Sequence, residues 1–436
     1  MHMLPRVAEL EERFPDVLAV VGVHSGKYPA ERHTENIRAA CARLGVLHPV
    51  VNDRHFRVWR DYAVDAWPTL AVVAPDGRLV GRQAGELPVD SLADVISGVA
   101  AEYDGAGLLR REPLTLPPAQ QPFPEPTGAL RFPTRLALLG ETLYVSDAGH
   151  HRVLELRLAE DGARAEVVRA WGGRAGFADG GSDAAAFREP QGLAVVNGSL
   201  LVADRSNHAI RRIDLESGHV TTVAGTGALG EWGAGGGVAL NTALRSPFDL
   251  LPRLGDVLIA MAGSHQLWSL DLSSGDIRPV AGTGGEDIVD GNSPRALLAQ
   301  PMGFTTDGTR AFFADAESSA IRFLYEGEVR TVVGTGLFDH GDHDGVADAV
   351  RLQHPQALAW HDDAVLVADT YNDKLKRVDP ATRESSALPG EAGSGEALWE
   401  PTGVVTDGAR TFVADTNHHR LCRLGESGAL LPVEIV

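Results

Sequence analysis

The sequence predicts an α/β domain followed by an all-β propeller of six blades. A motif of about 14 residues, typified by 200–213, returns six times before the chain ends. A proline stands fourteen residues before the marked position of every copy, and all length variation lies outside this interval. The proline and marked position of the six copies are Pro133 and Asp147, Pro190 and Asp204, Pro247 and Met261, Pro301 and Asp315, Pro355 and Asp369, and Pro401 and Asp415. Residues 1–104 do not share this repeat.

Each repeat has the pattern of four short strands. In the copy around Asp204, apolar and alternating runs over 192–196, 200–203, 209–215 and 220–223 are separated by Gly, Asn and Asp. Period-two alternation between such turn residues is typical of strands. A four-stranded unit of this length cannot bury both faces alone, so six copies predict six stacked blades closed into a ring over 130–436.

The motif also resembles a known repeat. Val-Ala-Asp-x-x-Asn-His-x-Ile/Leu-x-Arg, at 202–212 and 413–423, resembles the NHL repeat of six-bladed propellers. The resemblance implies an NHL-type propeller from about residue 130 to the C-terminus. The third copy departs from it, with Met261 in place of Asp and Ser264 in place of Asn or His.

Residues 1–104 alternate helical and strand patterns. Helices are expected over 3–14, 35–44, 55–62 and 88–103, and strands over 16–23, 46–51, 70–74 and 79–82. This order is typical of an α/β layer domain. Residues 105–129, with six prolines between 113 and 126, are expected to form a stiff linker.

This first domain resembles the thioredoxin fold. Trp67-Pro68-Thr69-Leu70 enters a strand whose turn, 75–77, is Pro-Asp-Gly. Together with 23–25, 27–29 and 48–53, this stretch is similar to the thioredoxin-like domain that precedes the propeller in the family of NHL-repeat-containing protein 2. The resemblance implies a cis Pro68 and an active face whose remnants are His2, Trp67, Pro68 and Thr69.

The redox motif itself is missing from the chain. Members of the family carry Cys-x-x-Cys followed by x-His-x-Leu-Pro, and His2-Met3-Leu4-Pro5 matches the end of that motif. The cysteines and a central strand would therefore precede Met1, and we expect Met1 to be internal to a longer reading frame. The alternative is a degenerate, nonredox domain that begins at Met1. Either way, residues 1–436 hold no vicinal dithiol, which thiol–disulfide exchange requires.

Composition excludes several partners. The net charge of −20 opposes binding to nucleic acid or anionic membranes, which are recruited by clustered Lys and Arg. No run approaches 18 apolar residues, as a spanning helix would require. The two cysteines, Cys41 and Cys422, form no disulfide framework, which favours a reducing compartment and a cytoplasmic location.

The residues that follow each repeat proline are candidate binding residues. They begin the innermost strands and should ring one mouth of the central channel, where their chemical variety favours a ligand or partner surface. They are Arg135, Gln191, Phe248, Asp249, Met302, Gln356 and Thr402.

Other recurring motifs have structural explanations. Gly-Thr-Gly at 225–227, 282–284 and 334–336 follows a strand without opening a helix, so a turn is favoured over a nucleotide loop. Asp-Gly at 179–180, 290–291 and 344–345 favours an Asx turn over calcium binding. The stretch 339–344, with His340 and His343, is the best isolated metal suspect, although an acidic surface loop has the same pattern. His150, His208, His265 and His418 are interpreted as turn-fixing residues at related positions. No cofactor or metal site is predicted.

The function predicted from these features is that of a cytoplasmic interaction protein whose propeller docks a protein partner. A thioredoxin-like thiol–disulfide oxidoreductase, in a longer form with upstream cysteines, is the first alternative. A propeller hydrolase or lactonase with a channel metal is the second, and Asp249 is its main acidic candidate. The sequence leaves open a small-molecule ligand.

Overall fold

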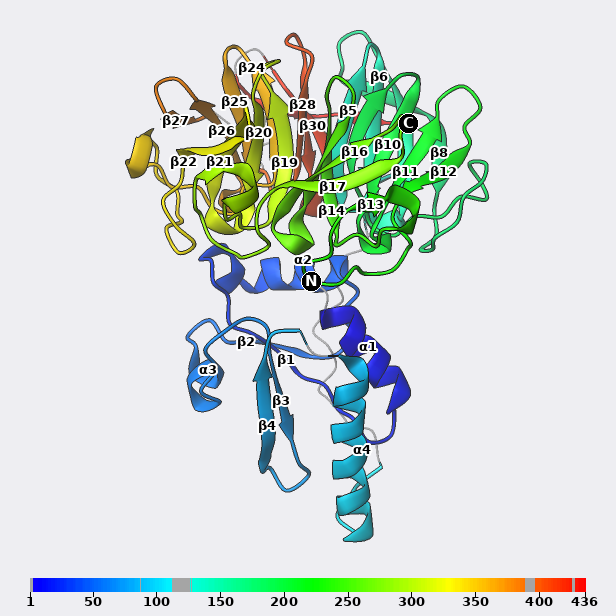
Figure 1. Cartoon of the computed structure of the whole chain (residues 1–436), viewed down its shortest axis with the longest axis vertical. Helices are drawn as coiled ribbons and strands as arrows, with labels where there is room; N and C mark the ends of the chain where they lie inside the picture. The colour runs from blue at the N-terminus through cyan, green and yellow to red at the C-terminus, as the bar shows by residue number, and fades with distance from the viewer. Residues whose placement is uncertain (1–2, 87, 112–125, 127, 389–396, 426–427) are drawn as a thin grey trace. The chain divides into compact units, whose positions relative to one another are not determined.

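The computed structural model describes residues 3–86, 88–111, 126, 128–388, 397–425 and 428–436. The chain divides into two compact units, 1–125 and 126–436 (Figure 1). Most of the predicted linker, 112–125 and 127, lies outside the described residues.

The first unit has the predicted order of helices and strands. Its elements are α1 (Met3–Arg13), β1 (Gly22–His24), η1 (Ala30–Arg32), α2 (Thr34–Arg43), β2 (Val50–Asn52), α3 (Arg57–Asp61), β3 (Thr69–Val73), β4 (Leu79–Ala84) and α4 (Val89–Gly105). The strands predicted over 16–23 and 46–51 shorten to three residues each. Among the described residues, β1 pairs only with β2, in parallel, and β3 only with β4, antiparallel. The thioredoxin-like assignment of this unit stays a prediction.

The second unit is a six-bladed propeller, as predicted. Every blade is a sheet of four consecutive antiparallel strands, labelled here blade I to blade VI. Blade I comprises β5 (Pro133–Leu139), β6 (Thr142–Asp147), β7 (Arg152–Leu158) and β8 (Arg164–Gly172); blade II β9 (Pro190–Val196), β10 (Ser199–Asp204), β11 (Ala209–Asp214) and β12 (Val220–Ala224); blade III β14 (Pro247–Pro252), β15 (Val257–Met261), β16 (Gln266–Asp271) and β17 (Asp276–Ala281); blade IV β19 (Pro301–Thr306), β20 (Ala311–Asp315), β21 (Ala320–Tyr325) and β22 (Glu328–Val333); blade V β24 (Ala357–His361), β25 (Ala364–Asp369), β26 (Lys374–Asp379) and β27 (Glu384–Ala387); blade VI β28 (Gly403–Thr406), β29 (Thr411–Asp415), β30 (Arg420–Leu424) and β31 (Leu430–Pro432).

The inner strands close a complete ring. Each lies against the next, in the order β5, β9, β14, β19, β24 and β28, and β28 returns to β5. Blade I also gains the strand β32 (Glu434–Ile435), which pairs in parallel with β8 through Glu434 and Arg164. The last residues of the chain therefore join the sheet of the first blade.

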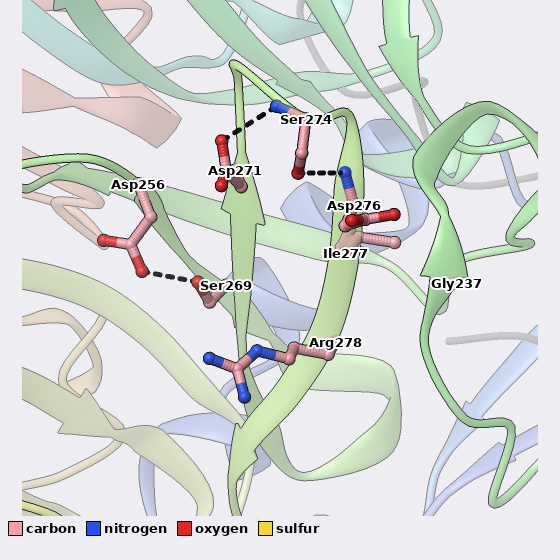
Figure 2. A pocket seen from close by; sticks show the side chains of 8 residues that line it. All are labelled: Gly237, Asp256, Ser269, Asp271, Ser274, Asp276, Ile277 and Arg278. Atoms are coloured by element: carbon pink, nitrogen blue, oxygen red, sulfur yellow. Dashed lines mark hydrogen bonds between the residues drawn. The ribbon is translucent and has the colours of Figure 1, made fainter.

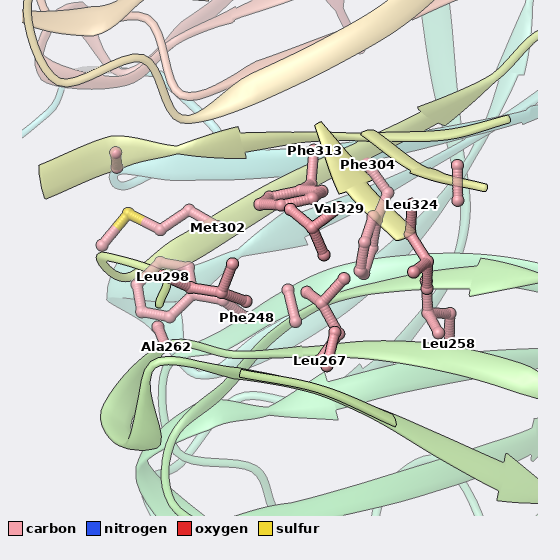
Figure 3. Packing of buried hydrophobic residues seen from close by; sticks show 14 of the residues in the cluster. Phe248, Leu258, Ala262, Leu267, Leu298, Met302, Phe304, Phe313, Leu324 and Val329 are labelled. Carbon is pink, nitrogen blue, oxygen red and sulfur yellow. The ribbon is translucent and has the colours of Figure 1, made fainter. Parts of the chain in front are cut away.

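The core of the propeller lies between neighbouring blades. Between blades III and IV, Phe248 and Met302 pack with Phe304, Phe313 and Leu267, all buried (Figure 3). Fully burying a large apolar side chain contributes about 1.5–3 kcal/mol. A blade thus buries its apolar faces only when its neighbours stack on it.

The antiparallel order gives the propeller two different faces. The repeat prolines, the turns after the marked positions and both ends of the long segments between blades lie on one face, here called the insertion-loop face. The middle of three of these segments pairs with the first residues of the outer strand, at the opposite end of the blade. Between blades the long segments are 173–189, 225–246, 282–300 and 334–354, and three of them add a two-residue edge strand: β13 (Gly237–Val238), β18 (Gly291–Asn292) and β23 (Gly345–Val346). The short turns between the first two and the last two strands of each blade form the other face, here called the hairpin face.

Candidate functional site

Arg135, on β5, crosses the axis of the propeller. Its guanidinium donates hydrogen bonds to the backbone carbonyl oxygens of Met302 at 2.8 Å, Gln356 at 2.6 Å and Thr402. These carbonyls belong to blade IV, which is opposite blade I in the ring, to blade VI, which is adjacent to it, and to blade V between those two. One side chain therefore links blade I to three others and fills the centre of the ring at this level.

Asp249, on β14 of blade III, faces the same guanidinium. Its carboxylate lies 3.9 Å from Nε of Arg135 and accepts the backbone N–H of Phe304 at 2.8 Å. Burial lowers the pKa of Arg135 and raises the pKa of Asp249, and each charge counteracts the effect on the other. Since both groups are buried, each charge stabilises the other.

Glycines on alternate blades allow the inner strands to approach closely. Gly192, Gly303 and Gly403 occupy, in blades II, IV and VI, the position that Arg135 holds in blade I. A Cβ at Gly192 would lie 2.5 Å from Cα of Asp249, and at the other two it would clash with neighbouring carbonyl oxygens. The ring is therefore too narrow at this level for six side chains.

Five of the seven predicted mouth residues lie in the inner strands, Gln356 and Thr402 directly precede β24 and β28, and most of the seven are buried. Only Gln356 is more than slightly exposed. Phe248 and Met302 point into the core between blades III and IV (Figure 3). Gln191 accepts a hydrogen bond through its carbonyl from Ser146 at 2.5 Å. What these positions contribute at the axis is mainly backbone carbonyls, and their binding role stays a prediction.

The marked aspartates form a second, repeated network. All five are fully buried, and one oxygen of each accepts, at 2.7–2.8 Å, the backbone N–H sixteen residues earlier. The other oxygen faces a basic side chain, either five or seven residues later. The pairs are Asp147 with Arg152, Asp204 with Arg211, Asp315 with Arg322, Asp369 with Lys376, and Asp415 with Arg420.

In blades II, IV and V the basic side chain also holds the insertion loop. Arg211 binds Asp179 at 2.7 Å and Arg322 binds Asp290 at 2.9 Å, while Lys376 lies 3.1 Å from Asp344. Asp179 also accepts the backbone N–H and hydroxyl of Thr222 on the outer strand. The Asp-Gly aspartates therefore bind the blade instead of capping their own turns, and the cation beside each is a protein side chain.

Blade III lacks this network entirely. Met261 replaces the aspartate, and the positions five and seven residues later hold Gln266 and Trp268. Trp268 donates its indole N–H to Gln266 at 3.0 Å, and Gln266 donates to the carbonyl of Gly282 at 3.1 Å. Carboxylate and cation are thus absent together.

The four histidines predicted at related turn positions occupy two positions. His150 and His418, three residues after the marked aspartate, bond to that aspartate at 2.8 and 2.9 Å. His208 and His265 lie four residues after the marked position and accept a backbone N–H from the following blade, as His151 and His419 also do.

In the stretch 339–344, suspected to bind a metal, two carboxylates bind groups of blade V. Asp342 binds Lys374 and Lys376 at 2.5 and 2.9 Å, and Asp344 accepts the N–H of Ala387 at 2.8 Å. Among the described residues, no group of three His, Cys, Asp or Glu is placed to hold a metal ion.

A shallow cavity of about 420 Å³ lies on the outer part of blade III (Figure 2). Two of its three acidic residues bind neighbouring groups. Asp256 accepts the hydroxyl of Ser269, and Asp271 accepts the hydroxyl of Ser273 and the N–H of Ser274. These bonds, the hydroxyl of Ser273 first, lower the pKa of Asp271 to about 2.

The predicted active face of the first unit is partly assembled. The Trp67–Pro68 peptide bond is cis, as the resemblance implies. The indole N–H of Trp67 donates to the carbonyl of Ser25 at 2.8 Å, and its ring lies 4.5 Å from that of Trp59. Thr69 donates its hydroxyl to the carbonyl of Ala66 at 2.7 Å. His2 lies outside the described residues.

Neither cysteine is an activated thiol. Burial raises the pKa of Cys41, and it raises the pKa of Cys422 to about 12. Because the thiolate is the nucleophile, both thiols are poor candidates for covalent chemistry.

Comparison with known proteins identifies the repeat. The NHL repeat family model matches residues 187–213, which include the motif around Asp204. The chain is 37% identical over 468 residues to Protein SUPPRESSOR OF QUENCHING 1, chloroplastic, of Arabidopsis thaliana, covering 100% of this chain and 44% of that protein. It is 33% identical over 470 residues to NHL repeat-containing protein 2 of Homo sapiens, covering 97% of this chain and 64% of that protein. The chain therefore spans less than two thirds of the length of either relative.

The comparison with solved structures gives alignments of low sequence identity. Virginiamycin B lyase from Staphylococcus aureus aligns with 71% of this chain and 86% of its own, at 10% identity and a TM-score of 0.44.

Among the described residues, no helix is long and apolar enough to cross a membrane.

Proposed function

Since this chain is an NHL-repeat protein related over nearly its whole length to NHL repeat-containing protein 2, we propose that it is an interaction protein whose propeller docks a protein partner. The observation that carries this proposal is the filled axis. At the level of Arg135 its guanidinium and the carbonyls that it binds occupy the axis, so we place partner binding on an outer surface.

The insertion-loop face supports docking. Large apolar side chains stand exposed on three loops of this face, Phe177, Trp232 to 57% and Phe338 to 70%. Neighbouring loops also touch, because Phe177 lies against Gly227 and Trp232 approaches Gly284. Apolar side chains gathered on one face are typical of protein interaction sites.

The hydrolase alternative finds less support. A channel metal would have to sit where the guanidinium of Arg135 lies, and two positive charges repel at that distance. Asp249, the acidic candidate for that role, is engaged by Arg135 and by the N–H of Phe304.

The oxidoreductase alternative rests on the first unit. Its cis Pro68 and its order of elements favour a thioredoxin-like domain, and the relatives are longer than this chain. In this proposal the first unit helps to recognise the partner. It would carry out thiol redox chemistry only in a form of the protein that has an upstream Cys-x-x-Cys. The two free thiols favour a reducing compartment, for which we propose the cytoplasm, although the plant relative is named as chloroplastic.

Site-specific crosslinking tests the docking face. A photoreactive residue would replace Trp232 on the insertion-loop face or Leu254, an exposed residue of the hairpin face, in the full chain inside its native cell. We expect the same protein partner to be crosslinked repeatedly from position 232 and not from position 254. Equal crosslinking from both positions would contradict the proposal.

The intact mass of the protein made from its native locus tests the redox alternative. A heavier product that carries Cys-x-x-Cys and reduces a model disulfide would make the redox function the leading one. A product that starts at Met1 would remove it.

A further inference from the structure

Every junction between blades contains the same side-chain hydrogen bond. The fourth residue after the marked position accepts the backbone N–H of the residue just before the next repeat proline, at 2.8–3.2 Å. The acceptor and donor residues are His151 and Glu189, His208 and Ser246, His265 and Gln300, Ser319 and His354, Asp373 and Glu400, and His419 and Phe132.

The backbone explains why a side chain is needed. All twelve residues have a positive φ, for example 54° at His151 and 52° at Glu189. In this conformation the donor N–H points away from the ladder of its own strand. A buried backbone N–H needs a partner, and the side chain from the preceding blade supplies it.

The acceptor atom fixes the protonation state of His151. Its Nδ1 accepts the N–H of Glu189 at 3.2 Å, so Nδ1 carries a lone pair and the ring is neutral. Protonation would place a hydrogen on Nδ1 that faces the hydrogen of Glu189. A serine hydroxyl keeps its lone pairs at every pH, and a carboxyl keeps an acceptor oxygen after protonation.

The charges around His151 come from both blades. Glu189 and Arg188 face it from blade II, and Arg131 and His150 from blade I. Burial is the largest influence and lowers the pKa of His151, the three basic groups lower it further, and only Glu189 raises it. Glu189 is also engaged by Arg205 at 3.2 Å and by Ser206 at 2.6 Å.

We infer that the junction between blades I and II is an acid-sensitive lock, in which protonation of His151 releases the amide of Glu189. The junction closed by Ser319 lacks this response. Burial raises the pKa of Asp373 to about 6, but its carboxyl keeps an acceptor oxygen for the amide of Glu400 after protonation. The inference concerns the ring itself and does not depend on the docking proposal.

The direction with pH follows from the chemistry. The unfolded chain binds the proton of this histidine more readily than the folded one, so the contribution of His151 to stability is full above its ordinary pKa. It is lost as the pH falls below about 6.5. The lock therefore opens on acidification and not on alkalinisation.

Hydrogen exchange at three amides of the full chain tests the inference. Exchange at Glu189, His354 and Glu400 would be measured at about pH 7.5 and about pH 5.5 and corrected for intrinsic exchange. We expect the protection of Glu189 to fall by about tenfold at the lower pH, since opening follows protonation. The amide of His354 should change by less than twofold, and that of Glu400 by less than that of Glu189, because protonated Asp373 keeps an acceptor oxygen. Unchanged protection at Glu189, or equal loss at all three amides, would overturn the inference.

Two variants sharpen the test. His151→Ser copies the acceptor that blade IV uses and should make protection at Glu189 independent of pH. His150→Ser is the matched control, because His150 bonds to Asp147 and not to the junction; it should keep the pH dependence. A pH dependence that survives in His151→Ser would refute the role of this ring, and the three-amide comparison in the unaltered protein stands even if a variant fails to fold.

Discussion

Blades II and III solve the same packing problem with opposite chemistry. At the marked position blade II buries Asp204, bonded to Arg211 at 2.8 Å, and blade III buries Met261. Seven residues later the buried cation of blade II corresponds to Trp268 in blade III, which packs with Met261 in an apolar cluster. The loop residue 32 positions before each of these is Asp179 in blade II and Gly236 in blade III.

The difference shows that the charged residues act as a unit. A buried ion pair stabilises little beyond an apolar pair of similar volume, whereas one charge left alone is strongly destabilising. Blade III has lost the carboxylate, the cation and the loop aspartate together, and no buried charge remains without a partner. Both sets are compatible with the ring, and we expect a mixture that leaves a buried charge without a partner to be destabilising.

Placing a charge in blade III gives the largest expected effect. Met261→Asp would bury a carboxylate with Gln266 and Trp268 where other blades carry a cation, so we expect a loss of about 3–5 kcal/mol of unfolding free energy. Urea unfolding followed by tryptophan fluorescence measures it, in a background of Trp59→Phe and Trp67→Phe so that only propeller tryptophans report. Met261→Leu is the control and should cost less than about 1.5 kcal/mol. A similar cost for both variants would refute the comparison.

Removing the cation from blade II comes next. Arg211→Met leaves Asp204 and Asp179 without their shared partner, and we expect a loss of about 3 kcal/mol in the same assay. The exposed neighbour Arg212→Met should change the unfolding free energy by no more than about 0.5 kcal/mol. Equal effects would mean that Arg211 is not part of a buried unit.

The pH dependence of the unfolding free energy should also distinguish blade II from blade III, because only blade II carries a titratable group, Asp204, at the marked position. Burial raises the pKa of Asp204 to about 6, against the bonds from Asn207, Arg188 and Arg211. Because the folded pKa lies above the unfolded one, its contribution is full below about pH 4 and is lost as the pH rises through 6. Relative to Asp204→Asn, the unaltered protein should lose roughly 2 kcal/mol between pH 4 and 7. Parallel curves for the two proteins would show that Asp204 does not titrate in this range.

Converting blade II to the chemistry of blade III should cost less than removing its cation. We expect the double variant Asp204→Leu/Arg211→Met to lose only about 1–2 kcal/mol, because no unpaired charge remains at the marked position. The double-mutant cycle at constant pH measures this coupling. Additive losses from the two single variants would show that the two residues do not act together.

Asp179, which holds the insertion loop to blade II, should give the smallest change in unfolding free energy. The side chain of Asp179 is 47% exposed, so solvent screens its pair with Arg211, and Asp179→Asn should cost less than about 1 kcal/mol. The change should instead appear locally, as faster amide exchange in 176–186 without a shift of the urea midpoint. A lowered midpoint with unchanged exchange in the loop would contradict the anchoring role.

The blade count and the strand order were predictable because they depend on local patterns. A fixed interval between proline and marked position defines one structural unit, and six intervals define six units. The departure of the third copy at Met261 was also visible, and so was the absence of a vicinal dithiol. These features need only the period of a strand and the chemistry of single residues.

The centre of the ring was not predictable from those patterns. Arg135 was placed correctly at the start of an inner strand, but its partners are carbonyls 167, 221 and 267 residues away. Whether a side chain lines an open mouth or fills the axis depends on how closely six strands converge, and the glycines of alternate blades decide that distance.

By itself, the sequence determined the repeating unit of this protein, because strand period, turn residues and spacing act over a few residues. Only the tertiary structure decided that Arg135 closes the axis, that Arg211 joins a buried aspartate to a loop, and that His151, one residue after His150, reaches the next blade. These contacts arise when the ring closes, and closure brings together residues that no local pattern relates.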